Sequence, residues 1–582
     1  MTDIFSVTPI VVPYDAVRSV FRVGNPSIAT ALPITNRWNP PAAAGTGVTL
    51  TYYFSDAPPS TYTQTDHGYT NESAVAWTPF QKTTVESALA GFASVANITF
   101  QRVDSQADAD LTYFLSSTIT AAGFAYYPWS SAPEKGTVLG DVYFSTSWFS
   151  ADLQLQNLYL AYHETGHALG LAHAFDTGNK PVIEDFGLPG GQLFSVVDQR
   201  RVPKPYYMLH ANTGGYSYDT YSEGSKPTGP MLLDILALQL FYGPNMTTGG
   251  GNDAYMFAVD PNFFRTIWDA GGHDKIDLSN QVHPSLVSLV PGVYSTIGLR
   301  DPFEGYTAES KAWALEDHPD ISKWNDGTNS LTIAFGAIIE DIVGSPVTDV
   351  LIGNEVANNL DGGGGNDKLS GGEGNDKLSG GKGNDILTGE MGSDTLYGEE
   401  GIDIAFFLGT KADYSVKPAD SSWILTDRNP ANGDDGTDTL INVERLHFTD
   451  TNVAIDMDGN AGKVARLLHA VFGPAAVQNK EYAGIGLSLL DQGLSYARLA
   501  EVAMRAAGKL TPGDIIDSLW LNVMTTPILA EQKSYFLGLL ENGLAIGDLT
   551  VLAANSSQNS AQVELLGVMT QGLDYLPYGT GV

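Results

Sequence analysis

Residues 362–406 read GGGGNDKLS, GGEGNDKLS, GGKGNDILT, GEMGSDTLY and GEEGIDIAF, so this part of the chain repeats every nine residues. Residues 344–352 and 353–361 keep the same register with more degenerate positions. A short fixed period predicts stacked units of one structure. In each unit the glycine-rich half is expected to form a tight turn with positive φ. The other half is expected to form a short strand with one large apolar side chain directed inward. These inward residues are Leu369, Leu378, Leu387 and Leu396.

The sixth position of each unit is an aspartate, which is expected to point into the turn. Carboxylate and turn carbonyl oxygens are the hard ligands that Ca²⁺ prefers. We therefore expect several structural calcium ions, with Asp367, Asp376, Asp385 and Asp394 as ligands. The alternative is a flexible glycine-rich linker, but a linker has no need for aspartate and leucine in register. Without calcium the like-charged carboxylates repel, and the segment is expected to be disordered.

A second motif, HETGHALGLAH, occupies residues 163–173. His163 and His167 are four residues apart, so a helix places both imidazoles on one face. Gly170 lets the backbone leave the helix and bring His173 round as a third ligand. Three imidazoles leave the fourth position of Zn²⁺ open, as a catalytic site requires. Glu164 is then placed to take a proton from a zinc-bound water.

The longer motif is similar to the signature of the metzincin peptidases, and the nonapeptides resemble repeats-in-toxin (RTX) sequences. Together they resemble the serralysin family of secreted bacterial metallopeptidases, and the resemblance covers about residues 30 to 410. Residues 230–243, 251–274 and 333–341 resemble that family as well. The resemblance implies a parallel β-roll and export through a type I secretion apparatus.

The same resemblance implies a methionine turn beneath the zinc, and Met208 stands at the right distance from His173. Serralysins carry a tyrosine two places after that methionine, where this chain has His210. His210 can take over the tyrosine's catalytic role, or it can bind zinc too firmly and block the water. Ala174 stands where the family usually has proline. Three tyrosines are alternative sources of the phenol: Tyr207, Tyr216 and Tyr218.

The composition excludes several classes of partner. The chain has 66 Asp and Glu against 30 Lys and Arg, a formal charge of −36, which disfavours nucleic acid and anionic membranes. It has no cysteine, so extracellular stability must come from packing and metals. The first twenty residues lack the basic start and apolar core of a Sec signal peptide. No apolar run approaches the eighteen residues of a transmembrane segment.

Apolar periodicity predicts the elements around the two motifs. A helix is expected from Pro79, with one apolar face made of Val85, Ala88, Leu89, Phe92 and Val95. Strands are expected at residues 48–54, 97–103, 109–115, 123–127 and 141–144. The last two look like the edge-strand region of metzincins, and that resemblance implies that an extended peptide substrate pairs with this sheet edge.

After the repeats, strands are expected at residues 414–416 and 423–427, and residues 436–450 are expected to complete or cap the roll. From about residue 458 the pattern becomes helical, with further helices around residues 499–506, 515–523 and 535–540. This region resembles a helical domain of bacterial surface and secreted proteins. Its role stays open between attachment or partner binding and a stabilising or export-related appendage.

Length predicts about four domains. They are a short arm or propeptide (1–25), an α+β metzincin zinc-peptidase domain (26–245), an all-β calcium-binding β-roll with its cap (246–456) and an all-α domain (457–582). The expected protein is a secreted or cell-surface-associated zinc endopeptidase that acts on proteins or peptides. One alternative is a catalytically weak, calcium-dependent surface-binding protein with a decayed peptidase domain, although the intact Glu164 argues against it. Another is a peptidase directed at one target, such as a surface layer.

Overall fold

The computed structural model describes residues 37–38, 43–57, 74–128, 138–150, 154–171, 227–259, 263–299, 330–431 and 433–578. The chain divides into two compact units, one within Val12–Asp341 and the other comprising Ile342–Val582. Across these described ranges, no helix combines the length and the apolar character needed to cross a bilayer.

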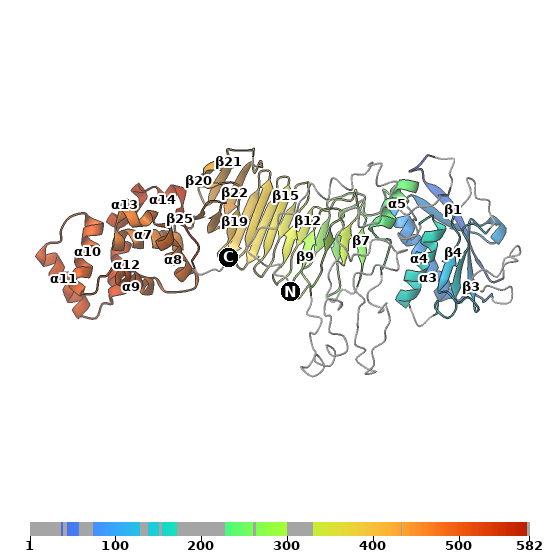
Figure 1. The fold of residues 1–582 in the computed structure, drawn as a ribbon, viewed down its shortest axis with the longest axis horizontal. Coiled ribbons are helices and arrows are strands. Elements are labelled where there is room, and N and C mark those ends of the chain that lie inside the picture. The colour runs from blue at the N-terminus through green and yellow to red at the C-terminus, as the bar shows by residue number, and fades with distance from the viewer. Residues whose placement is uncertain are drawn as a thin grey trace, which may run out of the picture. The chain divides into compact units, whose positions relative to one another are not determined.

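The first unit begins with a five-stranded mixed sheet (Figure 1). Its strands are β1 (Val48–Ser55), β2 (Ile98–Arg102), β3 (Leu111–Ser116), β4 (Gly123–Ala125) and β5 (Val142–Ser145), in the order β2-β1-β3-β5-β4. All neighbours are parallel except β4, which lies antiparallel to β5 at one edge. The predicted strands are confirmed, and the outer one ends two residues earlier than expected.

Two helices pack together beside this sheet, α3 (Pro79–Val95) and α4 (Gln154–Ala168). Helix α3 begins at a capping box in which Thr78 and Gln81 satisfy each other's backbone N–H groups, with proline at the first helical position. The apolar face predicted for α3 is buried. Phe92 of that face meets Tyr162 of α4 edge to face, with ring centroids 5.3 Å apart. A third helix, α5 (Leu232–Tyr242), also contacts α3.

After α5, the described residues of the first unit form short strands. They are β6 (Ala254–Met256), β7 (Arg265–Ile267), β8 (Lys275–Asp277), β9 (Leu286–Ser288), β10 (Tyr294–Ser295) and β11 (Leu331–Ile333). Earlier in the unit, η2 (Gln106–Asp108) forms a 3₁₀ turn. Strands β6 and β8 pair in parallel, and β10, β11 and β7 form a small sheet.

The second unit begins with the repeats, which form a roll of two parallel sheets. Its strands are β12 (Asp341–Val343), β13 (Val350–Ile352), β14 (Asn359–Asp361), β15 (Lys368–Glu373), β16 (Lys377–Lys382), β17 (Ile386–Met391), β18 (Thr395–Glu400) and β19 (Ile404–Phe406). Successive repeats alternate between the sheets, so Leu369 pairs with Leu387 and Leu378 with Leu396, each eighteen residues apart. The four predicted inward leucines are at most 2% exposed, as the period required.

Residues 436–450 continue the roll, as predicted. Strand β22 (Thr437–Ile441) extends the sheet of β18 and β23 (Arg445–His447) extends that of β19, both in parallel. Before them, η5 (Lys411–Asp413) leads into a hairpin of β20 (Tyr414–Ala419) and β21 (Ser422–Asp427). Strand β24 (Asn452–Ala454) then pairs antiparallel with β23, and β25 (Leu573–Tyr575) pairs antiparallel with β24, in the sheet that contains β19.

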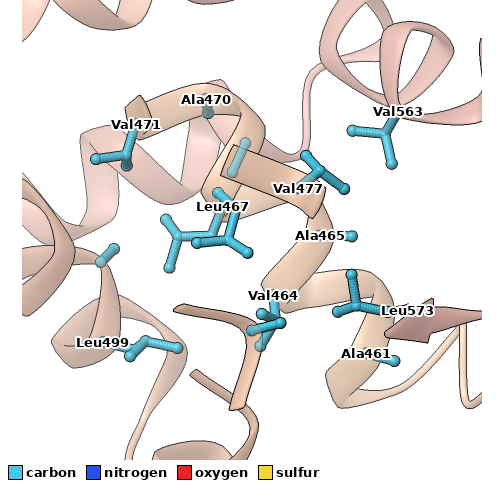
Figure 2. Close-up of a cluster of buried hydrophobic side chains, with 14 of the residues drawn as sticks. Ala461, Val464, Ala465, Leu467, Ala470, Val471, Val477, Leu499, Val563 and Leu573 are labelled. Atoms are coloured by element: carbon cyan, nitrogen blue, oxygen red, sulfur yellow. The ribbon is translucent and has the colours of Figure 1, made fainter. Parts of the chain in front are cut away.

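The remainder is helical, as expected after residue 458. The helices are α7 (Asn460–Phe472), η6 (Pro474–Gln478), α8 (Lys480–Asp491), α9 (Tyr496–Ala506), α10 (Pro512–Met524), α11 (Ala530–Glu541), α12 (Ile546–Ala554), α13 (Ser557–Leu565) and α14 (Val568–Gln571). Figure 2 shows their core, in which Val464, Leu467 and Val471 of α7 lie near Leu499 of α9. Leu573 of β25 joins the same cluster.

A buried arginine ties these helices to the end of the roll. Arg445 of β23 donates to Asp456 at 2.6 Å and to both carboxylate oxygens of Asp491 of α8, at 2.8 and 3.0 Å. The Arg445 side chain is 3% exposed. The guanidinium therefore depends on these two carboxylates for its countercharge.

Candidate metal centres

The first candidate centre lies on α4. His163 and His167 are buried, and their Nε2 atoms are 3.2 Å apart. A tetrahedral ion with Zn–N bonds of about 2.0–2.1 Å separates two ligand nitrogens by about 3.3–3.4 Å. The two imidazoles therefore already have the spacing that one zinc ion requires.

The contacts of His167 fix its protonation pattern. Its Nδ1 lies 2.7 Å from the carbonyl oxygen of Leu171, and a carbonyl can only accept, so Nδ1 carries the proton and donates it. Nε2 is then left with a lone pair, which is the form that binds a metal. The hydroxyl of Tyr127 lies 3.2 Å from the same Nδ1, and the two rings meet edge to face. Tyr127 follows strand β4, so this sheet edge reaches the candidate site.

Glu164 lies against the same edge strand. It is 4% exposed, and burial raises the pKa of its carboxyl to about 8. A Cβ added at Gly123 of β4 would lie 2.8 Å from Glu164 Cγ and 2.9 Å from its Oε1. Gly123 therefore makes the room that the glutamate occupies, a role that nothing in the local sequence indicated.

Two distant side chains hold the end of α4. Gly170 has a φ of 104°, in agreement with the expectation that it lets the chain leave the helix. Trp38 Nε1 donates to the Ala168 carbonyl at 2.9 Å, and the Tyr242 hydroxyl donates to the Leu169 carbonyl at 3.0 Å. Sequence reasoning missed Trp38 and Tyr242, because their partners are 130 and 73 residues away.

The other predicted residues of this centre lie outside the described residues. They are His173, Ala174, Met208, His210, Tyr207, Tyr216 and Tyr218. The structure therefore brings together His163, Glu164 and His167, whose nitrogen and carboxylate oxygen atoms lie within 4.8 Å of one another.

The second candidate centre is a ladder of buried aspartates along the roll. Each uses Oδ1 to accept the backbone N–H of the residue eighteen positions earlier. Thus Asp385 accepts from Asp367 at 2.8 Å, and Asp394 accepts from Asp376 at 2.7 Å. Asp367 and Asp376 accept in the same way from Asp349 and Asn358, at 2.7 and 2.8 Å.

The second carboxylate oxygen of each ladder aspartate is buried without a hydrogen-bond partner in the described part of the chain. It occupies the space beside the first glycine of its repeat: a Cβ at Gly380 would lie 2.4 Å from Asp385 Oδ2, and one at Gly389 would lie 2.1 Å from Asp394 Oδ2. A buried carboxylate oxygen with no donor is the group that a bound cation satisfies, so these residues fit Ca²⁺.

Burial raises the pKa of every ladder aspartate, and the neighbouring carboxylates raise it further. The pKa values reach about 9 for Asp367, about 7 for Asp376 and about 6 for both Asp385 and Asp394. The metal-free ladder therefore resists holding all its charges at neutral pH.

The ladder extends beyond the four aspartates expected from the sequence. Asp403 has the same buried, unpaired Oδ2, and its pKa is raised to about 7. Asp403 is the sixth residue of the unit GEEGIDIAF, so the sequence pattern was enough to predict it as a member of the ladder. The ladder continues with residues that follow the hairpin of β20 and β21. Asp394 donates its N–H to Asp438, and Asp403 donates its N–H to Glu444.

A third carboxylate cluster lies in the first unit, where carboxylate oxygens of Asp253, Asp269 and Asp274 lie within 4.8 Å of one another. Asp274 Oδ1 accepts from the Asp253 N–H at 2.6 Å, and Glu340 accepts from the Asp274 N–H at 2.7 Å. Asp274 Oδ2 is buried without a partner among the described residues, and the Asp274 pKa is raised to about 6. This oxygen set also fits a cation such as Ca²⁺.

The first unit has a helix with paired histidines and a glutamate beside a mixed sheet, and the second unit has a roll lined with aspartates. Together these features define a calcium-binding, metallopeptidase-like chain. Comparison with known proteins agrees with this class. Residues 343–378 and 370–405 match the family described as "RTX calcium-binding nonapeptide repeat (4 copies)".

The wider chain is similar to serralysins, which confirms the resemblance expected from the sequence. It is 30% identical to Serralysin B of Dickeya chrysanthemi over 283 residues, covering 45% of this chain and 55% of that relative. It is 29% identical to Metallopeptidase AprA of Pseudomonas marginalis over 282 residues, covering 43% and 54%. The chain thus spans about half the length of the relatives it matches. Among solved structures, one titled "Structure of myroilysin" matches with 20% identity and a TM-score of 0.15, covering 23% of this chain and 52% of that one.

Proposed function

We propose that this chain is a zinc-dependent endopeptidase of serralysin type whose roll folds around calcium. The 3.2 Å convergence of the His163 and His167 Nε2 atoms, with Glu164 buried beside them, is the observation that carries the proposal. The similarity to serralysins supports the same conclusion.

His163 and His167 would hold the metal, and His173 is the proposed third ligand. A bound zinc ion acts as a Lewis acid toward a peptide carbonyl and lowers the pKa of its water. Glu164 accepts the water proton and returns it to the leaving amine. Burial raises the pKa of the Glu164 carboxyl to about 8, so a cation held by the two histidines would favour the ionised form in which Glu164 can accept a proton.

The half-buried strand β4, the last in the order of its sheet, is the proposed binding site for the substrate backbone, which would pair with it as an added strand. Met208 is proposed to form the floor under the metal, and His210 to replace the family tyrosine. Under this proposal His210→Tyr retains or improves turnover, whereas His210→Ala lowers it and leaves zinc bound.

The domain limits and surroundings follow from the same proposal. The peptidase domain spans 26–245, the calcium-binding region 246–456 and the helical domain 457–582, with 1–25 as an arm or propeptide. Calcium-coupled folding of the roll fits export of an unfolded chain through a type I apparatus, followed by folding outside the cell. Protein or peptide substrates there, including surface-layer proteins, are the proposed targets.

Metal analysis combined with a proteolysis assay tests the zinc site. His167→Ala is expected to lose zinc and activity together. Glu164→Ala is expected to keep zinc and to lose about 10²–10⁴-fold in activity, because it moves protons and does not coordinate. Wild-type zinc content in His167→Ala rejects the ligand assignment. Activity of Glu164→Ala within tenfold of wild type shows that another group is the base.

A further inference from the structure

The helical region contains an internal repeat. Residues 489–504 (LLDQGLSYARLAEVAM) and 539–554 (LLENGLAIGDLTVLAA) align at an offset of fifty residues. The turns agree in detail: the Gly493 N–H donates to Leu490 and the Gly543 N–H to Leu540, with φ values of 87° and 98°. The region is therefore two helical repeats, α7–α9 and α10–α12.

Both repeats carry an apolar pocket in the same place, between their three helices. In the first repeat the pocket measures about 130 Å³ and includes Leu468 of α7, Gly486 of α8 and Ala503 of α9 in its lining. In the second it measures about 190 Å³, and Trp520, Phe536 and Ala553 line it at the equivalent positions. The first helices of the two repeats, which begin at Asn460 and Pro512, align at an offset of 52 residues, whereas the later helices align at fifty.

One substitution explains why the second pocket is larger. Gly486 lets α8 pack closely on α7, since a Cβ there would lie 2.9 Å from Val464 Cγ1. The residue of α11 equivalent to Gly486 is Phe536, and no residue of α11 is buried. The phenyl ring therefore holds α11 away from α10, and the space between them remains open at the surface, where Leu552 is 61% exposed.

The second pocket also carries a donor that the first lacks. Trp520 Nε1 is buried, and it has no hydrogen-bond partner among the described residues. At the equivalent place the first repeat has Leu468, which has no polar atom to satisfy. A buried, unpaired indole N–H is costly, and a carbonyl oxygen supplied from outside would satisfy it.

The charge around the two repeats differs in sign. Helices α10–α12 carry five carboxylates and a single lysine, Lys533, which is paired with Asp517 at 2.6 Å. The carboxylates belong to Asp514, Asp517, Glu531, Glu541 and Asp548. Helices α7–α9 carry three carboxylates against five lysines and arginines. A basic partner is therefore attracted to the second repeat rather than the first.

We propose that the second helical repeat, α10–α12, is a docking site for a basic protein segment that inserts one apolar side chain. A pocket of 190 Å³ accommodates a single leucine-sized anchor and is too small for most drug-sized ligands. The backbone carbonyl of the inserted residue accepts from Trp520 Nε1, and flanking lysines or arginines face the carboxylates. A second copy of this chain, with a formal charge of −36, is a poorer occupant.

A local spectroscopic readout tests the site in the full-length, calcium-loaded protein. Labelling with 5-fluorotryptophan gives one ¹⁹F resonance for each of nine tryptophans, and the resonance absent from Trp520→Phe belongs to Trp520. The probes are the capped peptides KKLKK, KKAKK and EELEE. KKLKK is expected to shift the Trp520 resonance saturably, and KKAKK to bind at least about tenfold more weakly, because burial of the leucine side chain supplies most of the affinity. EELEE is expected not to bind.

The repeat provides a matched control. Ala553→Leu fills the second pocket and is expected to weaken KKLKK binding at least about tenfold. Ala503→Leu makes the same change in the first pocket and is expected to leave binding unchanged. Circular dichroism verifies that both variants remain helical. Trp520→Phe, measured by anisotropy of a labelled KKLKK peptide, is expected to bind about threefold to tenfold more weakly through loss of one hydrogen bond.

Four results would overturn the proposal. Equal binding of KKAKK and KKLKK shows attraction by charge alone. Equal weakening by Ala503→Leu and Ala553→Leu removes the distinction between the pockets. A Trp520 shift with benzene and none with any peptide indicates a small-molecule site. A dimer in sedimentation that Ala553→Leu disperses assigns the site to a second copy of the chain.

Discussion

Asp385→Asn is expected to change the stability of the roll in opposite directions with and without calcium. Asparagine keeps an oxygen that can accept the Asp367 N–H, which lies 2.8 Å from Asp385 Oδ1. It replaces the buried, unpaired Oδ2 with an uncharged amide. The substitution therefore removes the charge and retains the ladder hydrogen bond.

In calcium-free buffer the variant is expected to be more stable. Burial raises the pKa of Asp385 from 3.8 to about 6, so at about pH 3 the carboxyl is mostly protonated in both the folded and unfolded states. As the pH rises from about 4 to about 6, the unfolded chain loses its proton before the folded state does, so wild-type stability falls across this range and stays low above it. At about 1.4 kcal/mol per pKa unit the whole effect is at most about 3 kcal/mol, or about 10²-fold in the folding equilibrium.

In millimolar calcium the sign is expected to reverse, because asparagine supplies no anionic ligand oxygen to the ion. Hydrogen–deuterium exchange of residues 344–406, compared between wild type and variant at equal pH, measures both effects. The control is Glu400→Gln, which makes an equal change of charge at an exposed site of the same roll. It is expected neither to stabilise the calcium-free roll nor to destabilise the calcium-loaded one. A variant that is less protected in both buffers refutes the reasoning, as does a calcium-free difference that persists undiminished at about pH 3.

Gly123→Ala is expected to keep zinc and lose about 10²-fold in peptidase activity, because its Cβ displaces the Glu164 side chain; unchanged turnover would show that the contact does not position the base. Gly380→Ala is expected to destabilise the calcium-loaded roll by about 1–3 kcal/mol in denaturant titration, since its Cβ meets the Asp385 carboxylate at 2.4 Å. Gly364→Ala, whose nearest contact is 3.4 Å, is the tolerated control, and equal losses would contradict the argument. Arg445→Leu is expected to lower the thermal stability of the helical region by about 3 kcal/mol or more, because it leaves two carboxylates without a countercharge. Coincident calorimetric transitions for wild type and variant would exclude this coupling.

Local periodicity predicted the parts of the fold whose signals lie close together in sequence. The apolar face of α3 and the inward leucines of the roll follow from spacings of three or four and nine residues, and the structure buries both. The histidine pair was predictable for the same reason, because one helix fixes both side chains.

Contacts between distant segments could not be predicted in this way. Trp38 binds the end of α4 across 130 residues, and Gly123 makes room for Glu164 from another strand. Neither residue type carries a local signature of that role. Asp438 was missed because the hairpin of β20 and β21 interrupts the nine-residue period, so its partner Asp394 lies 44 residues earlier.

The hydrogen bonds of the aspartate ladder all run in one direction along the chain. Each carboxylate accepts the N–H of a residue nearer the N-terminus, so each turn is completed by a turn that follows it in the chain. The series ends at Asp438 and Glu444, which belong to the segment beyond the hairpin. In a one-dimensional array each repeat contacts only its neighbours. Residues 437–447 supply the last acceptors of the series, so removing them would leave the N–H groups of Asp394 and Asp403 without their carboxylates and the final turns of the roll incomplete.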